Sequence, residues 1–415
     1  MKFDTIVIGG GLSGLVCGIS LQKSGRKCAI VSAGQNALNF SSGSFGLLSR
    51  LPDGTEVSEP LKAIPSLNES HPYRKIGVEK VSGYVNNVKS FFSDCGISLY
   101  GDETKNSYML TPTGNVKSTW MGMDEISLFP SRDFKVGEKA LIVNMQGYLD
   151  FNTQFIASSL ENKGTSCRIA AIKLDSMESL RKNPSEMRAV NIARVMDNEQ
   201  ERTKFIAAVK ALLSDEDVVI LPAVFGLKDK GAISQIKAAI GVKTLFLGTM
   251  PPSIPGVRAQ MSLKSAFEEA GGSFLMGDEA KSVKMTDGSV KAIYTENLGD
   301  VALEADNFVL ATGSFFAKGL VATPNRIYEP LFDLDVDFDE DRNKWYDPQF
   351  FNMQNYMGYG VTTDASFKAV KGGKTIDNLY VVGSVLSGMN ALYEYCGSGV
   401  SIVSAMYVAD SILGR

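Results

Sequence analysis

The sequence predicts an α/β fold built from a Rossmann-like domain, a β-meander and an inserted α/β domain. Three observations predict it. A short apolar strand, a glycine turn and a helix follow one another within residues 4–24. Strands and helices alternate again between residues 139 and 255. Two later apolar strands, at residues 307–313 and 378–384, each run into a glycine turn. Such alternation is typical of parallel sheets covered by helices.

The N-terminal unit predicts a phosphate-binding turn. Its parts are a strand at residues 4–8, the turn "GGGLSGL", a helix at residues 12–24 and a second strand at residues 28–32. In a GxGxxG turn the first glycine permits the tight bend, the second lets a phosphate approach the backbone, and the third lets helix pack on strand. Gly9, Gly11 and Gly14 fit these positions. The N–H groups at the start of the helix then favour a phosphate or pyrophosphate.

One expected part of a dinucleotide site is absent. An Asp or Glu about 20 residues further on would grip the ribose of an adenosine. Here the second strand ends in Ser32-Ala33-Gly34, and no acidic residue occurs between Asp4 and Asp53. This weakens the case for NAD and leaves FAD held in another way, or FMN. Ser32 and Gly34 remain candidates for the cofactor site, because a serine still offers a hydrogen bond there.

The remaining segments complete the expected domain plan. The binding domain consists of residues 1–50, 256–330 and 375–415, with a cap at 51–138, an inserted α/β domain at 139–255 and a returning loop at 331–374. Within the cap we expect a helix over residues 79–95. Strands at 282–286, 290–295 and 301–304 predict the meander, and residues 273–276 predict a third parallel strand.

The insert shows a regular alternation. Strands are expected at residues 140–144, 168–174, 218–225 and 244–247, and helices at 151–163, within 186–213 and at 232–240. The proline-rich stretch 249–256 marks its end, and a helix follows at residues 258–270.

Further candidates for the cofactor site lie after other strands, at the edge of the sheet where ligands bind. They are Ser41, Ser42 and Gly43 in "NFSSGSFGLLS", Thr312 and Gly313 after one late strand, Gly383 and Ser384 after the other, and Gly397 and Gly399 before the last helix. Each group also fits an ordinary polar loop or tight turn, and the two interpretations are compatible.

Composition excludes several classes of protein. The 42 basic and 46 acidic side chains give a formal net charge of −4, so we expect no nucleic-acid partner. Asp4 falls inside what would have to be the apolar core of a signal peptide. The longest obvious apolar stretch, residues 218–227, is well short of the roughly 18 residues of a membrane span. We therefore expect a cytoplasmic chain that does not itself cross a membrane.

The cysteines predict no metal centre. Five widely spaced cysteines and one histidine contain no CxxC pair and supply no usual iron–sulfur or zinc site. Cys17 and Cys396 are expected to pack in the interior, with Cys396 the better placed to touch a cofactor.

Several stretches together resemble the B subunit of the bacterial anaerobic glycerol-3-phosphate dehydrogenase. They are "FDTIVIGGGLSGLVCG", "NFSSGS", "LLSRLPDG", "RAVNIAR", "LPAVFGL", "MPPSIPGVR", "ATGSFFAKGLVA", "YGVTTD", "NLYVVGSVLSG" and "CGSGVSIVSA". The resemblance implies a flavoprotein described with FMN, with FAD as the alternative. It also implies two partners, which are a larger FAD-containing subunit, the A component, and a membrane-attached iron–sulfur subunit, the C component.

The activity implied by the resemblance is oxidation of sn-glycerol 3-phosphate to dihydroxyacetone phosphate, with electrons passed to quinone in fumarate or nitrate respiration. This chain is expected to relay electrons, at the inner face of the inner membrane through its partners. Two rivals stay open: a self-sufficient flavin oxidoreductase acting on another small alcohol or amine, and a noncatalytic scaffold with an empty flavin pocket.

Candidates for the chemistry itself are few. Alcohol oxidation needs a base for the hydroxyl proton and cations for the phosphate. His71 is the only histidine, although a histidine beside proline is more often a surface or structural residue. Arg258 is a candidate to face the pocket, while Arg188 and Arg194 are by default solvated. The alternating aspartates of residues 333–339 predict an edge strand with a charged outer face.

Overall fold

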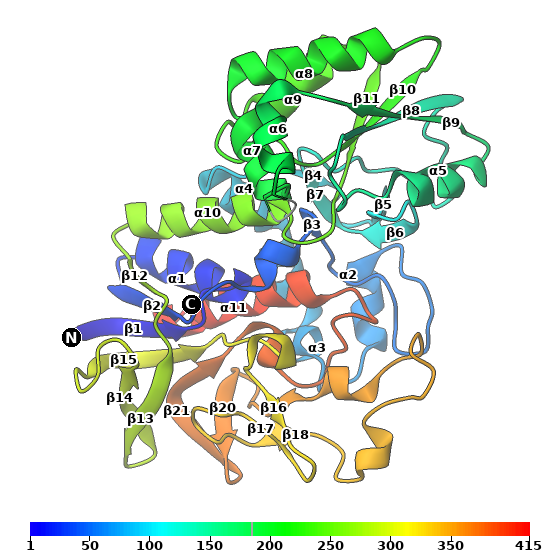
Figure 1. The fold of residues 1–415 in the computed structure, drawn as a ribbon. Coiled ribbons are helices and arrows are strands. Elements are labelled where there is room, and N and C mark those ends of the chain that lie inside the picture. The colour runs from blue at the N-terminus through cyan, green and yellow to red at the C-terminus, as the bar shows by residue number, and fades with distance from the viewer. Residues whose placement is uncertain (184–185) are drawn as a thin grey trace.

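The core of the molecule is a parallel sheet that joins distant parts of the chain (Figure 1). The computed structural model describes residues 1–183 and 186–415. Its parallel strands lie in the order β12 (Ser273–Met276), β2 (Cys28–Ser32), β1 (Lys2–Ile8), β15 (Leu303–Leu310) and β21 (Lys374–Val381). The predicted Rossmann-like fold is confirmed, including the third parallel strand at residues 273–276.

The meander differs from the expected one in its last strand. Strands β13 (Ala280–Thr286) and β14 (Ser289–Thr295) pair antiparallel as predicted. The expected strands at 301–304 and 307–313 are instead the single strand β15. The reason is that Glu304 pairs with Ala292 of β14 and also with Lys2 of β1. One stretch of backbone therefore closes the meander and continues the parallel sheet.

Three helices cover one face of this sheet. They are α1 (Leu12–Lys23), α10 (Ile254–Glu269) and α11 (Gly397–Leu413), which pack side by side (Figure 1). Gly18 of α1 shows how close the layers are, because a Cβ there would lie 2.8 Å from Ile30 of β2. Helix α1 is buried on most of its surface, which explains why its sequence is apolar throughout rather than striped.

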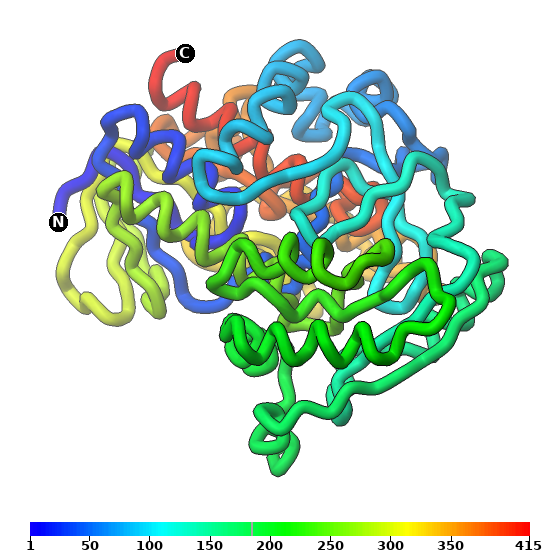
Figure 2. The backbone as a smooth tube through the Cα atoms, turned by 90° about the horizontal axis from the view of Figure 1, so that it is seen from above, coloured from blue at the N-terminus to red at the C-terminus, as the bar shows by residue number. Residues whose placement is uncertain are grey.

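The insert forms a second layered unit with its own core (Figure 2). Its sheet is parallel, in the order β11 (Lys243–Leu247), β10 (Val218–Pro222), β8 (Lys139–Met145) and β9 (Ser166–Ile172). Its helices are α5 (Thr153–Glu161), α6 (Asp175–Arg181), α7 (Ala189–Met196), α8 (Glu199–Leu212) and α9 (Ala232–Ile240). Helix α6 was not predicted. The other elements lie where the alternation placed them, with ends shifted by a few residues.

Residues 51–138 pack against the main domain. Their longest helix, α4 (Val78–Asp94), confirms the predicted one and contacts α11 together with α3 (Pro72–Ile76). The short elements here are α2 (Pro60–Ala63), the strands β4 (Leu99–Gly101) and β7 (Met121–Met123), and the hairpin of β5 (Ser107–Leu110) and β6 (Val116–Thr119). Strand β3 (Ser44–Phe45), which precedes this region, pairs with β7 in the same small sheet as β4.

The expected edge strand over residues 333–339 is wrong in extent. Only Val336–Asp337 forms a strand, β18, which pairs with β19 (Gly360–Val361). Asp335 instead accepts hydrogen bonds at 2.8 Å from the backbone N–H groups of Gly372 and Gly373, so its carboxylate ties a turn. The other short strands are β16 (Val321–Ala322), β17 (Ile327–Tyr328) and β20 (Lys368–Lys371). Within the described ranges, no helix is long and apolar enough to cross a bilayer.

Candidate functional site

A cavity of about 640 Å³ opens at the carboxyl ends of the parallel strands. The segments that follow β1, β2, β12, β15 and β21 all contribute to its wall, as does the start of α11. This is the edge at which open α/β sheets bind ligands. The predicted site residues that line it are Gly9, Gly11, Ser32, Gly34, Ser41, Thr312, Gly313, Ser384 and Gly397.

The three glycines of the first turn have different roles. A Cβ at Gly9, whose φ is +122°, would lie 2.1 Å from the carbonyl oxygen of Ala311. A Cβ at Gly14 would lie 1.9 Å from the carbonyl oxygen of Gly9, so these two positions allow close packing of backbone. At Gly11 the nearest atom to a Cβ would be Asn36 Cβ, at 3.9 Å. Gly11 therefore faces open space at the cavity wall, where a phosphate needs to approach.

Five predicted residues lie outside the cavity wall, namely Gly14, Ser42, Gly43, Gly383 and Gly399. Most of the glycines serve close packing instead. A Cβ at Gly383 would lie 2.4 Å from Ser13 Oγ, and one at Gly399 would lie 2.3 Å from Tyr73 Oη. These glycines allow close packing of the elements behind the cavity wall, and they do not form the wall itself.

Two helices begin at this cavity. Gly11 is the N-cap of α1 and Cys396 is the N-cap of α11, and no side chain caps either helix. Gly11, Leu12, Gly397 and Ser398 line the cavity. The N-terminal N–H groups of a helix lack intrahelical partners and carry the positive end of its dipole. The cavity thus favours negative charge at two places.

Asn36, which sequence reasoning missed, holds the glycine turn in place. Its Nδ2 donates to the carbonyl oxygen of Gly10 at 2.8 Å, and its Oδ1 accepts from the backbone N–H of Leu38 at 2.9 Å. Because Asn36 follows β2 and lines the same cavity, a polar residue shortly after a predicted parallel strand was the available signal.

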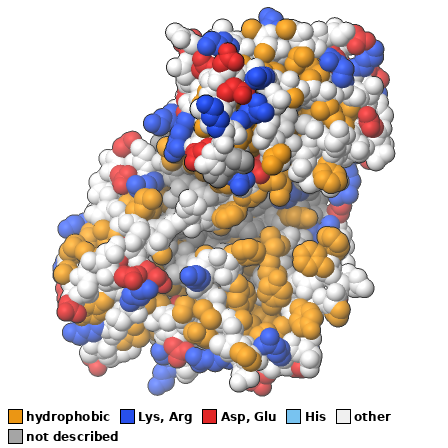
Figure 3. All heavy atoms as spheres, viewed as in Figure 1, with side chains coloured by type: hydrophobic (Ala, Val, Ile, Leu, Met, Phe, Trp, Pro, Cys, Tyr) orange, Lys and Arg blue, Asp and Glu red, His pale blue; other side chains and the backbone are white. Residues whose placement is uncertain are grey.

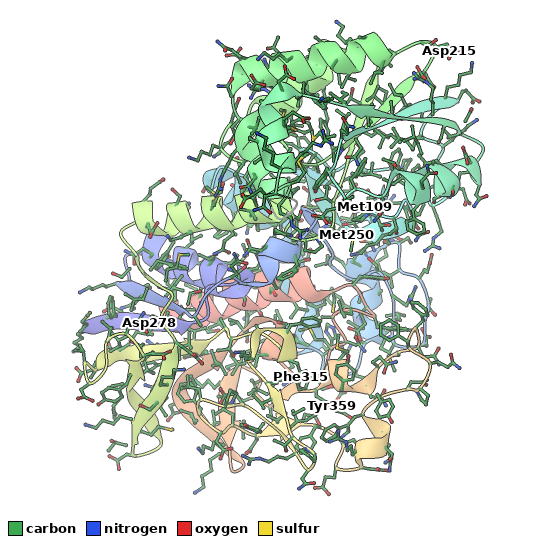
Figure 4. The ribbon with its side chains drawn as sticks, viewed as in Figure 1. Met109, Asp215, Met250, Asp278, Phe315 and Tyr359 are labelled. Carbon is green, nitrogen blue, oxygen red and sulfur yellow. The ribbon has the colours of Figure 1, made fainter. Side chains whose placement is uncertain are left out.

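An acidic pair after β12 was also missed. Asp278 and Glu279 line the cavity, and Asp278, labelled in Figure 4, donates its backbone N–H to the carbonyl oxygen of Ser32 at the end of β2 at 3.1 Å. Asp278 accepts hydrogen bonds from Thr295 Oγ1 at 2.6 Å and from the backbone N–H of Asn297 at 2.9 Å. Carboxylates therefore exist at this end of the cavity, although they come from β12 rather than from β2. Their position directly after a strand was the signal.

Glu329 places another carboxyl group in the cavity wall. It is 1% exposed and accepts hydrogen bonds from the backbone N–H groups of Leu331 at 2.9 Å and Phe332 at 2.7 Å. Burial raises the pKa of this carboxyl group, and the backbone hydrogen bonds act in the opposite direction.

The residues present fit a phosphate-bearing flavin. Thr312 lines the cavity, and its buried hydroxyl has no hydrogen-bond partner among the described residues. A Cβ at Gly34 would meet nothing within 4 Å, which leaves a second open approach to the backbone beside that at Gly11. An open backbone, two helix N-termini and an unpartnered hydroxyl suit an anionic, polar-edged ligand.

His71 has a structural position. It is 1% exposed and does not line the cavity. Its Nδ1 accepts a hydrogen bond from the backbone N–H of Tyr73 at 3.1 Å, which caps α3, and its Nε2 lies 3.3 Å from Glu394 Oε2. Because Nδ1 is an acceptor, the neutral ring carries its proton on Nε2. Although Cys396 completes a buried His–Glu–Cys cluster, Nε2 therefore has no lone pair for a metal.

The expectation that Arg258 faces the pocket is wrong. Its Nη2 donates to both carboxylate oxygens of Glu125 at 2.5 Å, and its Nη1 donates to the carbonyl oxygen of Gly226 at 3.0 Å. Both members of the ion pair are buried. A buried guanidinium needs such a partner, and Glu125 lies in the cap region, away from the cavity wall.

The remaining candidates also have local partners. Arg188 pairs with Asp150 at 3.1 Å, and Arg194 donates to Asn191 at 3.0 Å, in the exposed positions expected of them. Cys17 and Cys396 are buried free thiols, and burial raises the pKa of both. Cys396 Sγ lies 3.4 Å from Glu394 Oε2 and does not line the cavity.

Comparison with known proteins gives a consistent result. A family model described as "FAD binding domain" matches residues 4–400. The B subunit of the anaerobic glycerol-3-phosphate dehydrogenase of Yersinia enterocolitica is 42% identical over 100% of this chain and 98% of that protein. The protein of the same name from Glaesserella parasuis is 35% identical over the full length of both.

Solved structures are more distant. The 3-ketosteroid delta1-dehydrogenase of Sterolibacterium denitrificans is 11% identical, with a TM-score of 0.47 over 100% of this chain and 99% of that one. This similarity is too low to support any statement about substrate.

Proposed function

Because this chain belongs to the family of anaerobic glycerol-3-phosphate dehydrogenase B subunits and carries its FAD binding domain, we propose that it is the flavoprotein subunit of such a complex. The complex oxidises sn-glycerol 3-phosphate to dihydroxyacetone phosphate and passes the electrons to quinone, and this chain relays them. The observation that supports the proposal most directly is the open backbone at Gly11, at the uncapped start of α1.

The chain's own residues would hold the cofactor. The N-terminus of α1 binds the phosphate, while Thr312 and Ser41 offer hydroxyl groups along the cavity. The N-terminus of α11 favours negative charge at another part of the wall. When bound, a flavin supplies a two-electron acceptor that can also pass on single electrons.

The length of the cavity supports FAD over FMN. Beyond Gly11 the wall continues past Gly34 to Asp278 and Glu279, the region at which a dinucleotide places its adenosine. Asp278 is buried with both carboxylate oxygens hydrogen-bonded, whereas the exposed Glu279 offers acceptors for ribose hydroxyls in place of the acidic residue that β2 lacks. Acid release of the cofactor followed by chromatography should give FAD. Release of FMN would contradict the dinucleotide assignment and leave the flavin assignment intact.

The relay role predicts how the cofactor is reduced. The purified chain, mixed anaerobically with sn-glycerol 3-phosphate, should keep its oxidised flavin spectrum, and addition of the larger FAD-containing subunit should bleach it. Bleaching of the isolated chain by the substrate would show direct oxidation and contradict the relay. A chain purified gently without any flavin would favour a scaffold.

Exposed aromatic side chains support a place in a larger assembly. Phe350 is 83% exposed and Phe351 is 95% exposed, with their rings 5.3 Å apart. They project from a loop whose carbonyl groups surround the amide of Gln354, so their display is ordered. Figure 3 shows hydrophobic side chains gathered on the same lower half of the molecule. Partners that include the iron–sulfur subunit would bring the chain to the inner membrane.

Substitution of both phenylalanines tests whether they contact the partner subunits. The variant Phe350→Ser/Phe351→Ser should retain less of the co-expressed FAD-containing and iron–sulfur partners on affinity purification. Phe155→Ser, on an exposed aromatic of α5, is the matched control and should retain both. Equal retention by all three proteins would show that the aromatic pair does not contact the partners.

A further inference from the structure

Two cations share one aromatic ring in the segment that leads into α11. The Nζ of Lys117 lies 4.9 Å from the centre of the Tyr395 ring, and the guanidinium of Arg50 lies 5.8 Å from the same centre. Arg50 also lies 5.0 Å from the ring centre of Tyr393. Cation–π attraction holds each positive group to the rings, but it does not cancel the repulsion between them.

Neither cation has a carboxylate partner in the part of the chain that the structure describes. Among the described residues, no ion pair or side-chain hydrogen bond involves Lys117 Nζ or the Arg50 guanidinium. The carboxylates near Arg50 and Tyr395 along the chain have other contacts. Asp53 accepts a hydrogen bond from the backbone N–H of Thr55 at 2.9 Å. Glu56, whose backbone forms a bridge with Arg50, pairs with Arg132 at 2.7 Å. Glu394, next to Tyr395, is buried against His71 and Cys396.

The surroundings make this arrangement costly without an anion. Arg50 and Lys117 are both partly buried, and burial lowers the pKa of the Lys117 ammonium. A hydrogen bond of 3.1 Å between Ser118 Oγ and Ser49 Oγ holds the two cation-bearing segments together. The fold thus brings both positive groups to the Tyr395 ring, although each would be better hydrated in open water.

Tyr395, the ring that both cations contact, lies two residues before a residue of the cavity wall. Tyr395 has φ of +52°, a left-handed conformation that is rare for a residue with a side chain and that is often found at functional sites. Its carbonyl oxygen packs against Gly46, where a Cβ would lie 2.2 Å away. Gly46 follows Phe45, and Gly397 comes two residues after Tyr395, and both Phe45 and Gly397 line the cavity.

We propose that Arg50 and Lys117 form an anion site, beside the flavin cavity, that binds the phosphate group of a small phosphate monoester. Arg50 offers a planar pair of donors that matches phosphate oxygens, and Lys117 adds a compact charge. The choice of monoester, sn-glycerol 3-phosphate or its oxidation product, rests on the proposed function. The anion site itself does not, and the relay role alone does not require it.

Calorimetric titration of the purified full chain tests the site with three probes: sn-glycerol 3-phosphate, inorganic phosphate and glycerol. The first two should bind and glycerol should not. Arg50→Gln and Lys117→Met should each weaken binding about tenfold or more, because each removes a charge-assisted contact. Lys117→Arg keeps the charge and should retain binding. Lys105→Met removes an exposed lysine and is the matched control, with unchanged affinity.

Three results would overturn the site: no binding of either phosphate compound to the unaltered chain, full affinity in both charge-removing variants, or equal binding of glycerol. Flavin content and melting temperature, measured on the same preparations, show that each variant is folded. A chain that binds phosphate but no flavin would contradict the proposed function and keep this site. A flavin-loaded chain without phosphate binding would contradict this site alone.

Discussion

At the scale of single residues, the glycines of the first turn differ in their surroundings, because some pack against backbone and one faces the cavity. A side chain at Gly9 or Gly14 would overlap backbone atoms at 2.1 Å or 1.9 Å, whereas one at Gly11 would enter open space. Gly11 also has φ of −80° and ψ of −171°, an extended conformation that any residue adopts. The same motif therefore contains two positions that allow close packing of the backbone and one position that leaves the cavity wall open.

Gly11→Val should abolish flavin retention while the melting temperature of the flavin-free chain changes little. The added methyl groups fill the space that a phosphate needs, and they meet no backbone. Flavin absorbance per chain and thermal unfolding measure the two effects. Gly14→Ala is the contrasting variant, and it should lower the melting temperature because its Cβ would meet the Gly9 carbonyl. Full cofactor occupancy in Gly11→Val would contradict the assigned pocket.

The buried pair of Arg258 and Glu125 is also a residue-scale feature. Arg258→Met leaves the Glu125 carboxylate buried without its partner, and this should lower the free energy of unfolding by about 3–5 kcal/mol. The double variant Arg258→Met/Glu125→Leu removes both charges and should be clearly more stable than the single variant. Urea unfolding measures both, and a double variant as unstable as the single one would show that the charge pair is not the cause.

At the scale of elements, the helices that begin at the cavity depend on neighbours elsewhere in the chain. Gly399 in the first turn of α11 packs against Tyr73 of α3, and Gly46 donates its backbone N–H to Ser398 Oγ at 2.7 Å. Helix α3 is capped in turn by His71, which lies against Glu394 just before α11. The start of α11 is therefore held in part by the cap region, through Tyr73 and His71.

His71→Ala should destabilise the chain by about 1 kcal/mol or more, since it removes an N-cap and leaves Glu394 without its neighbour. His71→Asn supplies an N-cap acceptor of a preferred type and should recover part of this loss. Chemical unfolding of both variants measures the difference. If the two variants are equally unstable, the cap contributes nothing and the contact with Glu394 dominates.

At the scale of the whole molecule, two hydrophobic cores lie on either side of the helix α10. One core belongs to the main domain and the cap, and the other belongs to the insert (Figures 1 and 2). Ile254 at the start of α10 belongs to the insert's core, while Ala259 belongs to the other. No described residue of the insert lies in the cavity wall.

Calorimetric melting should therefore show two transitions, of which flavin shifts only one. A ligand stabilises the unit that binds it, by about 2.7 kcal/mol at a concentration of 100 times Kd. Added flavin should raise the transition of the main domain and leave that of the insert in place. A single transition that moves as a whole with flavin would show that α10 couples the two cores into one cooperative unit.

Prediction from sequence succeeded where neighbours in space are neighbours in the chain. The strand, turn and helix of residues 4–24 form one local unit, and the insert alternates over short loops. The prediction of two separate strands within residues 301–313 was wrong because β15 pairs with two strands from different parts of the chain. The expectation that Arg258 faces the pocket was wrong because its partner, Glu125, lies 133 residues away in the sequence.

The sequence by itself determined the parallel α/β fold and the position of the glycine turn, because these depend on short-range order and on the steric freedom of glycine. Only the tertiary structure decided that Asp278 reaches the cavity, that Arg258 is buried with Glu125, and that Arg50 and Lys117 meet on one ring. Such groups come together when the chain closes over long separations, and their charge and burial follow from that closure.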